Sequence, residues 1–168
     1  MTSDETPPLT HLSSDGSVHM VDVGDKEVTE RRATAEAVVS MSPSLADRLF
    51  AGDLPKGDVL ATVRLAGITA AKRTSDLIPL AHPIALTAVT VEVERHPDGA
   101  RIETDCRVKE RTGVEMEAMT AAAVAALALY DMIKSIERGV VIGPIRLLHK
   151  SGGRSGTWEL GQRSLSEE

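Results

Sequence analysis

The chain has 168 residues, of which 42% are hydrophobic and 26% are charged, so one soluble globular domain with an adequate core is expected. Its net charge of −6 argues against a general nucleic-acid binder, because such proteins need a basic face to displace counterions. The single cysteine, Cys106, excludes an internal disulfide and a multi-cysteine zinc site.

The two ends of the sequence are polar. We expect residues 1–12 to form a disordered tail, residues 13–156 the single domain that carries any catalysis, and residues 157–168 a flexible tail. The N-terminal stretch lacks the basic and then apolar pattern of a secretory signal. The apolar run Ala118–Tyr130 is too short and too rich in alanine to span a bilayer. A cytoplasmic location is therefore expected.

The first half of the domain predicts a loop, a strand and two helices. Residues 13–32 are charged and without periodicity, which is typical of a long and partly mobile loop, and such loops often act as lids. Residues 33–41 alternate as a strand does, and residues 42–52 open with Ser-Pro and close on glycine, as a short helix does. Residues 59–77 carry the apolar stripe of a longer helix, which the prolines of "LIPLAHP" must end.

The second half predicts a hairpin, a long helix and a last strand. Residues 89–94 and 101–108 alternate on either side of the turn "HPDG", so one face of the hairpin should be dry and the other charged. A helix is predicted over residues 114–138, ended by Gly139, and a strand over residues 140–150. This order predicts an α+β fold of the ferredoxin-like, split β-α-β type, with an antiparallel four-stranded sheet and helices packed on one face.

The long helix is apolar all round between Ala118 and Leu129, which indicates burial on every side. One side can lie on the sheet, and in so small a domain a second subunit is the expected cover of the other. Glu117 and Asp131 lie fourteen residues apart on this helix, about 21 Å at helical rise. Two such helices paired antiparallel across a two-fold axis would bring Glu117 of one chain near Asp131 of the other.

The candidates for chemistry begin with Asp131 and Lys134, where the apolar run ends. Two opposite charges one helical turn apart are by themselves more typical of a surface ion pair than of a proton-transfer pair. Glu115 and Glu117 have an ordinary explanation as well, because acids in the first turn of a helix complement its dipole.

Several basic residues allow the same two interpretations. Lys72 and Arg73 suit the last turn of a helix, His82 in its proline-framed loop fits a structural histidine, and "HKSGGRSG" lacks the spacing of a phosphate-binding P-loop. Lys56 is the exception, because a cation just before a helix start is unfavourable. Together, cations at loops and element ends of an acidic protein, with no metal-ligand spacing among its histidines, indicate acid–base chemistry on an anionic substrate.

Four stretches are similar to one known family. They read "HMVDVGDK", "KGDVLATVRLAGITAAKRTSDLIPLAHP", "RIETDCRVKERTGVEMEAMTAA" and "ALYDMIKSIERGVVIGPIRLLHKSGGRSG". Over residues 9–156 the chain resembles the molybdenum cofactor biosynthesis protein C family, the cyclic pyranopterin monophosphate synthases. The resemblance implies a lyase that converts (8S)-3′,8-cyclo-7,8-dihydroguanosine 5′-triphosphate into cyclic pyranopterin monophosphate and diphosphate by general acid/base catalysis.

The resemblance also implies a hexamer, a trimer of dimers, with active sites at a dimer interface. The sequence itself requires no metal site and no cofactor held by the protein, although Mg²⁺ could accompany the triphosphate. Ala81 departs from the family, which often has cysteine at this position, so a thiol there is not required for the chemistry. The implied catalytic residues are Asp131, Lys134 and Lys56. The implied substrate-binding residues are Leu80, Ala81, His82, Met116, Glu117, Lys72, Arg73 and Lys150.

Two other functions remain open at this point. A non-catalytic, ferredoxin-like oligomer that binds an anionic metabolite as a regulatory module would share the fold, the interface and the cations. It would have no need for Asp131 to exchange a proton. An RNA-binding module of the same fold would need aromatic side chains on its sheet face, and neither hairpin strand has any.

Overall fold

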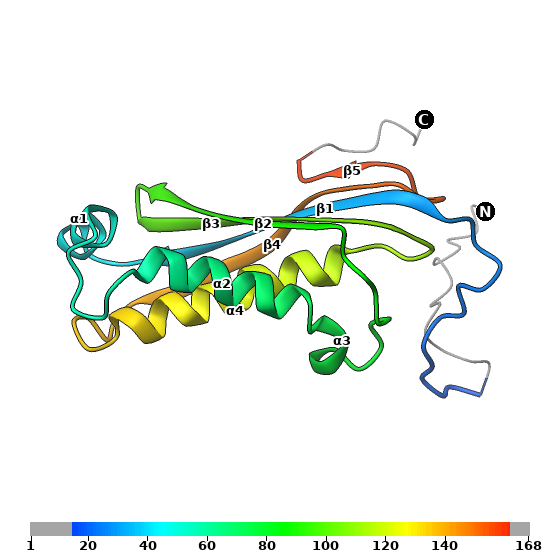
Figure 1. The fold of residues 1–168 in the computed structure, drawn as a ribbon, viewed down its shortest axis with the longest axis horizontal. Helices are drawn as coiled ribbons and strands as arrows, with labels where there is room; N and C mark the ends of the chain where they lie inside the picture. The colour runs from blue at the N-terminus through cyan, green and yellow to red at the C-terminus, as the bar shows by residue number, and fades with distance from the viewer. Residues whose placement is uncertain (1–14, 162–168) are drawn as a thin grey trace, which may run out of the picture.

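The computed structural model describes residues 15–161, which form an antiparallel sheet with helices along one face (Figure 1). The predicted α+β class is confirmed, with five strands in the order β2-β3-β1-β4-β5 in place of the predicted four. The elements in chain order are β1 (Thr29–Ser40), α1 (Pro43–Ala51), α2 (Val59–Ala71), α3 (Thr74–Leu77), β2 (Ala88–His96), β3 (Gly99–Glu110), α4 (Glu115–Ile133), β4 (Val141–Ser151) and β5 (Trp158–Glu159).

The sheet order matches the split β-α-β arrangement, because β1 lies between β3 and β4, which α4 connects. The additional strand β5 pairs with His149 and Lys150 of β4, in a stretch that the sequence predicted to be a flexible tail. Glycines permit this return of the chain. Gly152 and Gly156 have positive φ angles, which residues with a Cβ atom rarely adopt.

β1 begins at Thr29, four residues before the predicted strand, because its charged first residues pair with the end of β3. On the face away from the helices, the carboxylate of Glu36 accepts hydrogen bonds from Arg101 at 2.5 Å and from Arg146 at 2.7 Å. Burial acts to raise the pKa of Glu36, but the two arginines lower it below its usual value. The sheet face without helices is therefore covered in part by its own ion pairs.

The prediction of a single helix over residues 59–77 is wrong, because the helix is interrupted between Ala71 and Thr74. The Thr74 hydroxyl donates to the carbonyl oxygens of Ala70 and Ala71, at 3.3 and 3.1 Å. The amide of Arg73 also donates to the Ala70 carbonyl, at 3.0 Å. These bonds satisfy the last carbonyls of α2 without continuing the helix.

α4 ends at Ile133, five residues before the predicted end. The following turn is held by the Glu137 carboxylate, which accepts from the amide of Ser42 at 3.0 Å and from its hydroxyl at 2.5 Å. Ser42 is also the N-cap of α1. This long-range contact directs the chain toward β4, and local sequence patterns do not encode it.

α4 is the central helix of the core, with the sheet on one side and α2 on another. Gly67 of α2 permits close approach, since a Cβ atom there would lie 3.2 Å from the carbonyl oxygen of Ala121. α2 thus supplies part of the cover that the sequence interpretation assigned to a second subunit. Leu65 of α2 and Leu127 of α4 nevertheless stay 65% and 58% exposed.

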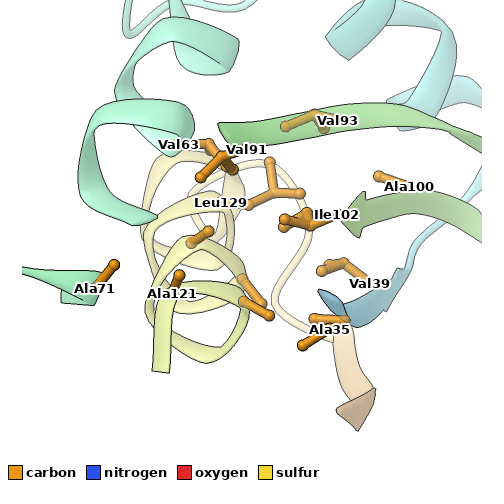
Figure 2. Packing of buried hydrophobic residues seen from close by; sticks show 14 of the residues in the cluster. Ala35, Val39, Val63, Ala71, Val91, Val93, Ala100, Ile102, Ala121 and Leu129 are labelled. Atoms are coloured by element: carbon orange, nitrogen blue, oxygen red, sulfur yellow. The ribbon is translucent and has the colours of Figure 1, made fainter. Parts of the chain in front are cut away.

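The core beneath the sheet contains small and branched aliphatic side chains. Figure 2 shows Val63 of α2, Val91 of β2, Ile102 of β3 and Leu129 of α4 converging on one another. By length and composition alone α4 could cross a membrane, but half of its most apolar stretch is buried within this fold. We therefore interpret α4 as a core helix.

Candidate active site

A cavity of about 570 Å³ lies at the first turn of α4. Its walls come from residues 21–26, from the proline-framed loop after α3, from the β3–α4 connection and from the adjacent ends of β1 and β4. Six of the eight predicted substrate-binding residues line this cavity: Leu80, Ala81, His82, Met116, Glu117 and Lys150. Segments distant in the sequence therefore meet in one site.

Glu117 is the buried carboxyl group of the cavity, with only 3% of its surface exposed. Burial raises the pKa of Glu117 to about 7, and the neighbouring Glu115 carboxylate adds to the rise. A carboxyl group with this pKa can both donate and accept a proton near neutral pH. The first-turn position that looked ordinary in the sequence is thus suited to acid–base chemistry.

Lys150 is a cation of the cavity lining that lies beside the Glu115 carboxylate. Its Nζ atom lies 3.4 Å from a carboxylate oxygen of Glu115 and donates a hydrogen bond to the Ser155 hydroxyl at 2.6 Å. Lys150 belongs to β4 and Ser155 to the glycine-rich stretch that follows. This stretch, which lacks the spacing of a P-loop in the sequence, forms part of the cavity wall.

Sequence reasoning missed four cations of the cavity, namely Lys26, Arg31, Arg32 and Arg111. Arg31 is fixed by two hydrogen bonds to backbone carbonyls at the end of β3, those of Glu110 and Arg111, at 2.9 and 3.0 Å. Lys26 lies in the quoted stretch "HMVDVGDK" and could have been found there. Arg31 and Arg32 are identified only by the pairing of β1 with its neighbours.

A second cavity of about 740 Å³ adjoins the first and shares Lys26, Arg31 and Ser155 with it. Arg154 lines it from the glycine-rich stretch. The side chain of Thr29 also lines it, and its hydroxyl oxygen is buried without a hydrogen-bond partner. Cations are thus concentrated along the boundary of the two cavities, an arrangement that attracts an anionic ligand.

The three predicted catalytic residues meet at the opposite end of α4. Lys134 forms an ion pair with Asp131 at 2.6 Å, and the Nζ atom of Lys56 donates to the backbone carbonyl of Asp131 at 2.7 Å. The hydrogen bond from Lys134 lowers the pKa of Asp131, with Lys56 adding to the effect, and the same bond raises the pKa of Lys134. Lys56 also satisfies a carbonyl left open at the end of the helix.

Within one chain, the structure does not bring the two groups of predicted residues together. Asp131 lies fourteen residues along α4 from Glu117, about 21 Å at helical rise. Asp131 and Lys134 are both exposed. The cavity and the exposed charged cluster are thus separate regions of the protomer.

Lys72 and Arg73 line neither of the two cavities. They lie in the turn between α2 and α3, where the guanidinium of Arg73 forms an ion pair with Asp76 at 3.2 Å. Their role in substrate binding stays a prediction. Among residues 15–161, no group of three or more His, Cys, Asp or Glu side chains is arranged to hold a metal ion.

The fold and the site define an α+β protein whose cation-lined cavity suits a small anionic ligand, with titratable groups at both ends of its central helix. The sequence pattern of the MoaC family matches residues 20–153. The chain belongs to this family.

Relatives with curated names are similar over nearly the whole chain. The chain is 56% identical over 153 residues to the cyclic pyranopterin monophosphate synthase of Herpetosiphon aurantiacus, a match that covers 90% of this chain and 93% of the relative. It is 53% identical over 161 residues to the protein of the same name from Brucella ovis, a match that covers 94% of this chain and 96% of the relative.

Proposed function

We propose that this protein is a cyclic pyranopterin monophosphate synthase of molybdenum cofactor biosynthesis. It acts as a lyase that converts (8S)-3′,8-cyclo-7,8-dihydroguanosine 5′-triphosphate into cyclic pyranopterin monophosphate and diphosphate. The observation that carries this proposal is the match, at 53–56% identity and over about nine-tenths of the chain, to relatives that bear this name. The cation-lined cavity supports it, because the substrate is a polyanion.

The residues of the cavity suit the binding of such a substrate. Lys26, Arg31 and Lys150 supply positive charge from three different segments, which attracts the triphosphate and neutralises charge as diphosphate leaves. Glu117 provides a carboxyl group that changes protonation near neutral pH. Leu80 and Met116 contribute apolar surface for the purine-derived ring.

Proton transfer also requires the cluster of Asp131, Lys134 and Lys56, which lies about 21 Å away in the same chain. We therefore propose that each active site is composite, with Glu117 from one chain and Asp131 from another. Pairing of two chains across a two-fold axis gives this arrangement, and a trimer of such dimers gives the hexamer. The exposure of Leu65 and Leu127 on the helical layer supports contact with a second copy.

The proposal includes no cofactor held by the protein. Mg²⁺ enters it only as a companion of the triphosphate, since divalent cations commonly bind substrate phosphates together with few protein ligands. The enzyme would act in the cytoplasm.

The direct test is incubation of the full-length protein with the cyclised GTP intermediate, followed by mass analysis of the products. We expect cyclic pyranopterin monophosphate and diphosphate in equal amounts. The rival function, an oligomer that binds an anionic metabolite for regulation, predicts binding of the intermediate without its conversion. Binding without product would reject the synthase.

A further inference from the structure

A hydrogen bond crosses from the proline-framed loop to the segment that precedes β1. The Nε2 atom of His82 lies 2.8 Å from the backbone carbonyl oxygen of Val21. From this contact we infer that His82 is a positioning residue, which holds residues 21–26 in place as a wall of the cavity. The inference builds on the proposed function, because it concerns how the same substrate is bound.

The two partners of this bond belong to two different segments that line one cavity. Val21, Val23 and Lys26 line it from the N-terminal segment, and His82 and its neighbours line it from the loop after α3. The bond therefore joins two walls that are more than fifty residues apart in the sequence. Without it, the N-terminal wall loses a direct tie to the rest of the site.

Local hydrogen bonds within residues 21–26 connect Val21 to Lys26. The carboxylate of Asp22 accepts from the amide of Gly24 at 2.8 Å, and the amide of Lys26 donates to the carbonyl of Val23 at 3.1 Å. These local bonds make residues 22–26 a braced turn. When Val21 is held, Lys26 is held at the boundary of the two cavities.

The loop that carries His82 is itself restricted. Pro79 and Pro83 flank the histidine, and the fixed φ angle of proline reduces the number of conformations available to the loop. The amide of Ala81 also donates to the carbonyl of Ile78 at 3.0 Å. The imidazole is thus presented to Val21 from a stiff support, as a positioning role requires.

The chemistry of the contact limits what His82 can do. A carbonyl oxygen only accepts hydrogen bonds, so the Nε2 atom must carry a proton. While the segment is in place, Nε2 is therefore not available to take a proton from substrate. Loss of the contact should weaken substrate binding much more than it slows the bound substrate's conversion.

The test compares two variants of the full-length protein, His82→Phe and His82→Gln. Phenylalanine keeps a ring but has no donor, whereas the glutamine amide can donate from near the Nε2 position. Hydrogen–deuterium exchange of residues 21–26 is measured without substrate, and KM and kcat are measured with the cyclised GTP intermediate. His96→Gln is the matched control, since that histidine lies at the end of β2 and lines neither cavity.

In His82→Phe we expect exchange of residues 21–26 to rise about five- to tenfold, the effect of losing one hydrogen bond, with a similar rise in KM. kcat should stay within about threefold, and His82→Gln should recover most of both losses. Wild-type exchange in His82→Phe would overturn the inference. A His82→Gln variant that keeps residues 21–26 protected from exchange but loses kcat would also overturn the inference. If His82→Phe does not fold, the result for His82→Gln alone tests the inference.

The exchange measurement separates this inference from the proposed function. It uses the protein without substrate, so its result does not depend on which reaction the protein performs. A wild-type protein that makes no product from the cyclised intermediate would refute the synthase activity. Faster exchange in His82→Phe would still identify His82 as the residue that holds the segment.

Discussion

Glu117 combines two features that rarely occur together, a fully buried carboxyl group and a position in a cavity lined with cations. Its pKa of about 7 means that the folded protein keeps the proton at a pH where an unfolded chain, with a pKa near 4.5, has lost it. The free energy of unfolding therefore falls as the pH rises from the unfolded pKa to the folded pKa of Glu117. Below the unfolded pKa both states are protonated and the penalty is absent.

We predict that Glu117→Gln removes this pH-dependent penalty. Between about pH 4.5 and pH 7 the free energy of unfolding of the wild type should fall by about 2–3 kcal/mol relative to that of the variant. Urea unfolding at pH 4.5, 6 and 8 measures the difference. The exposed Glu92→Gln serves as control and should follow the wild type. Parallel curves for wild type and Glu117→Gln would contradict the raised pKa.

The same variant should lose activity, because an amide cannot exchange the proton.

Asp131, unlike Glu117, lies on the surface, where it forms an ion pair with Lys134. An exposed ion pair of this kind contributes little to stability. We predict that Asp131→Asn keeps the oligomer and the binding of substrate but lowers kcat by about a hundredfold or more. Asp47→Asn, which breaks another exposed ion pair, that with Arg95, is the matched control and should keep full activity. An unchanged kcat in Asp131→Asn would show that Asp131 is not the acid/base group of the reaction.

At the scale of elements, the contact between α2 and α4 fixes the long helix over the sheet. It depends on Gly67, where a Cβ atom would meet Val91 at 3.0 Å and the backbone carbonyl of Ala121 at 3.2 Å. A backbone oxygen cannot move aside as a flexible side chain can. The two helices would have to separate, and the core they share with the sheet would loosen.

We therefore predict that Gly67→Ala lowers the free energy of unfolding by about 1–3 kcal/mol, the usual effect of overpacking a core. Gly139→Ala is the matched control, because nothing lies within 4 Å of a Cβ atom there and its φ angle is not in the positive range. Thermal and urea unfolding compare the two. Equal stability of both variants would show that the helices separate without cost.

The elements also illustrate where sequence patterns fail. Alternation predicted β2, β3 and most of β1, because these strands have one apolar side. The break after Ala71 was missed, since it depends on how the Thr74 hydroxyl meets the last carbonyls of α2. β5 was missed because two residues contain no periodic signal.

At the scale of the whole molecule, the distance between the two groups of predicted site residues has a consequence for assembly. If each site takes Glu117 from one chain and Asp131 from another, two different inactive variants can complement each other. A site that lies within one chain does not allow this. Subunit mixing therefore tests the composite site independently of any structure of the assembly.

We predict that Glu117→Ala and Asp131→Asn are each inactive alone and that a mixture regains activity after subunit exchange. With random pairing about half of the dimers are hybrids, each with one intact site of two, so about a quarter of wild-type activity should return. Mass spectrometry of differently tagged chains verifies the exchange. Full exchange without recovery of activity would reject the shared site.

The sequence by itself determined the α+β class, the order of the main elements and the family, because periodic burial and long matched stretches are properties of the chain. It also identified six residues of the main cavity through that resemblance. Only the tertiary structure placed Arg31 in the site, buried Glu117 and connected His82 to Val21. Burial and proximity depend on segments that are distant in the sequence, and a local pattern contains no information about which distant residue will lie beside it.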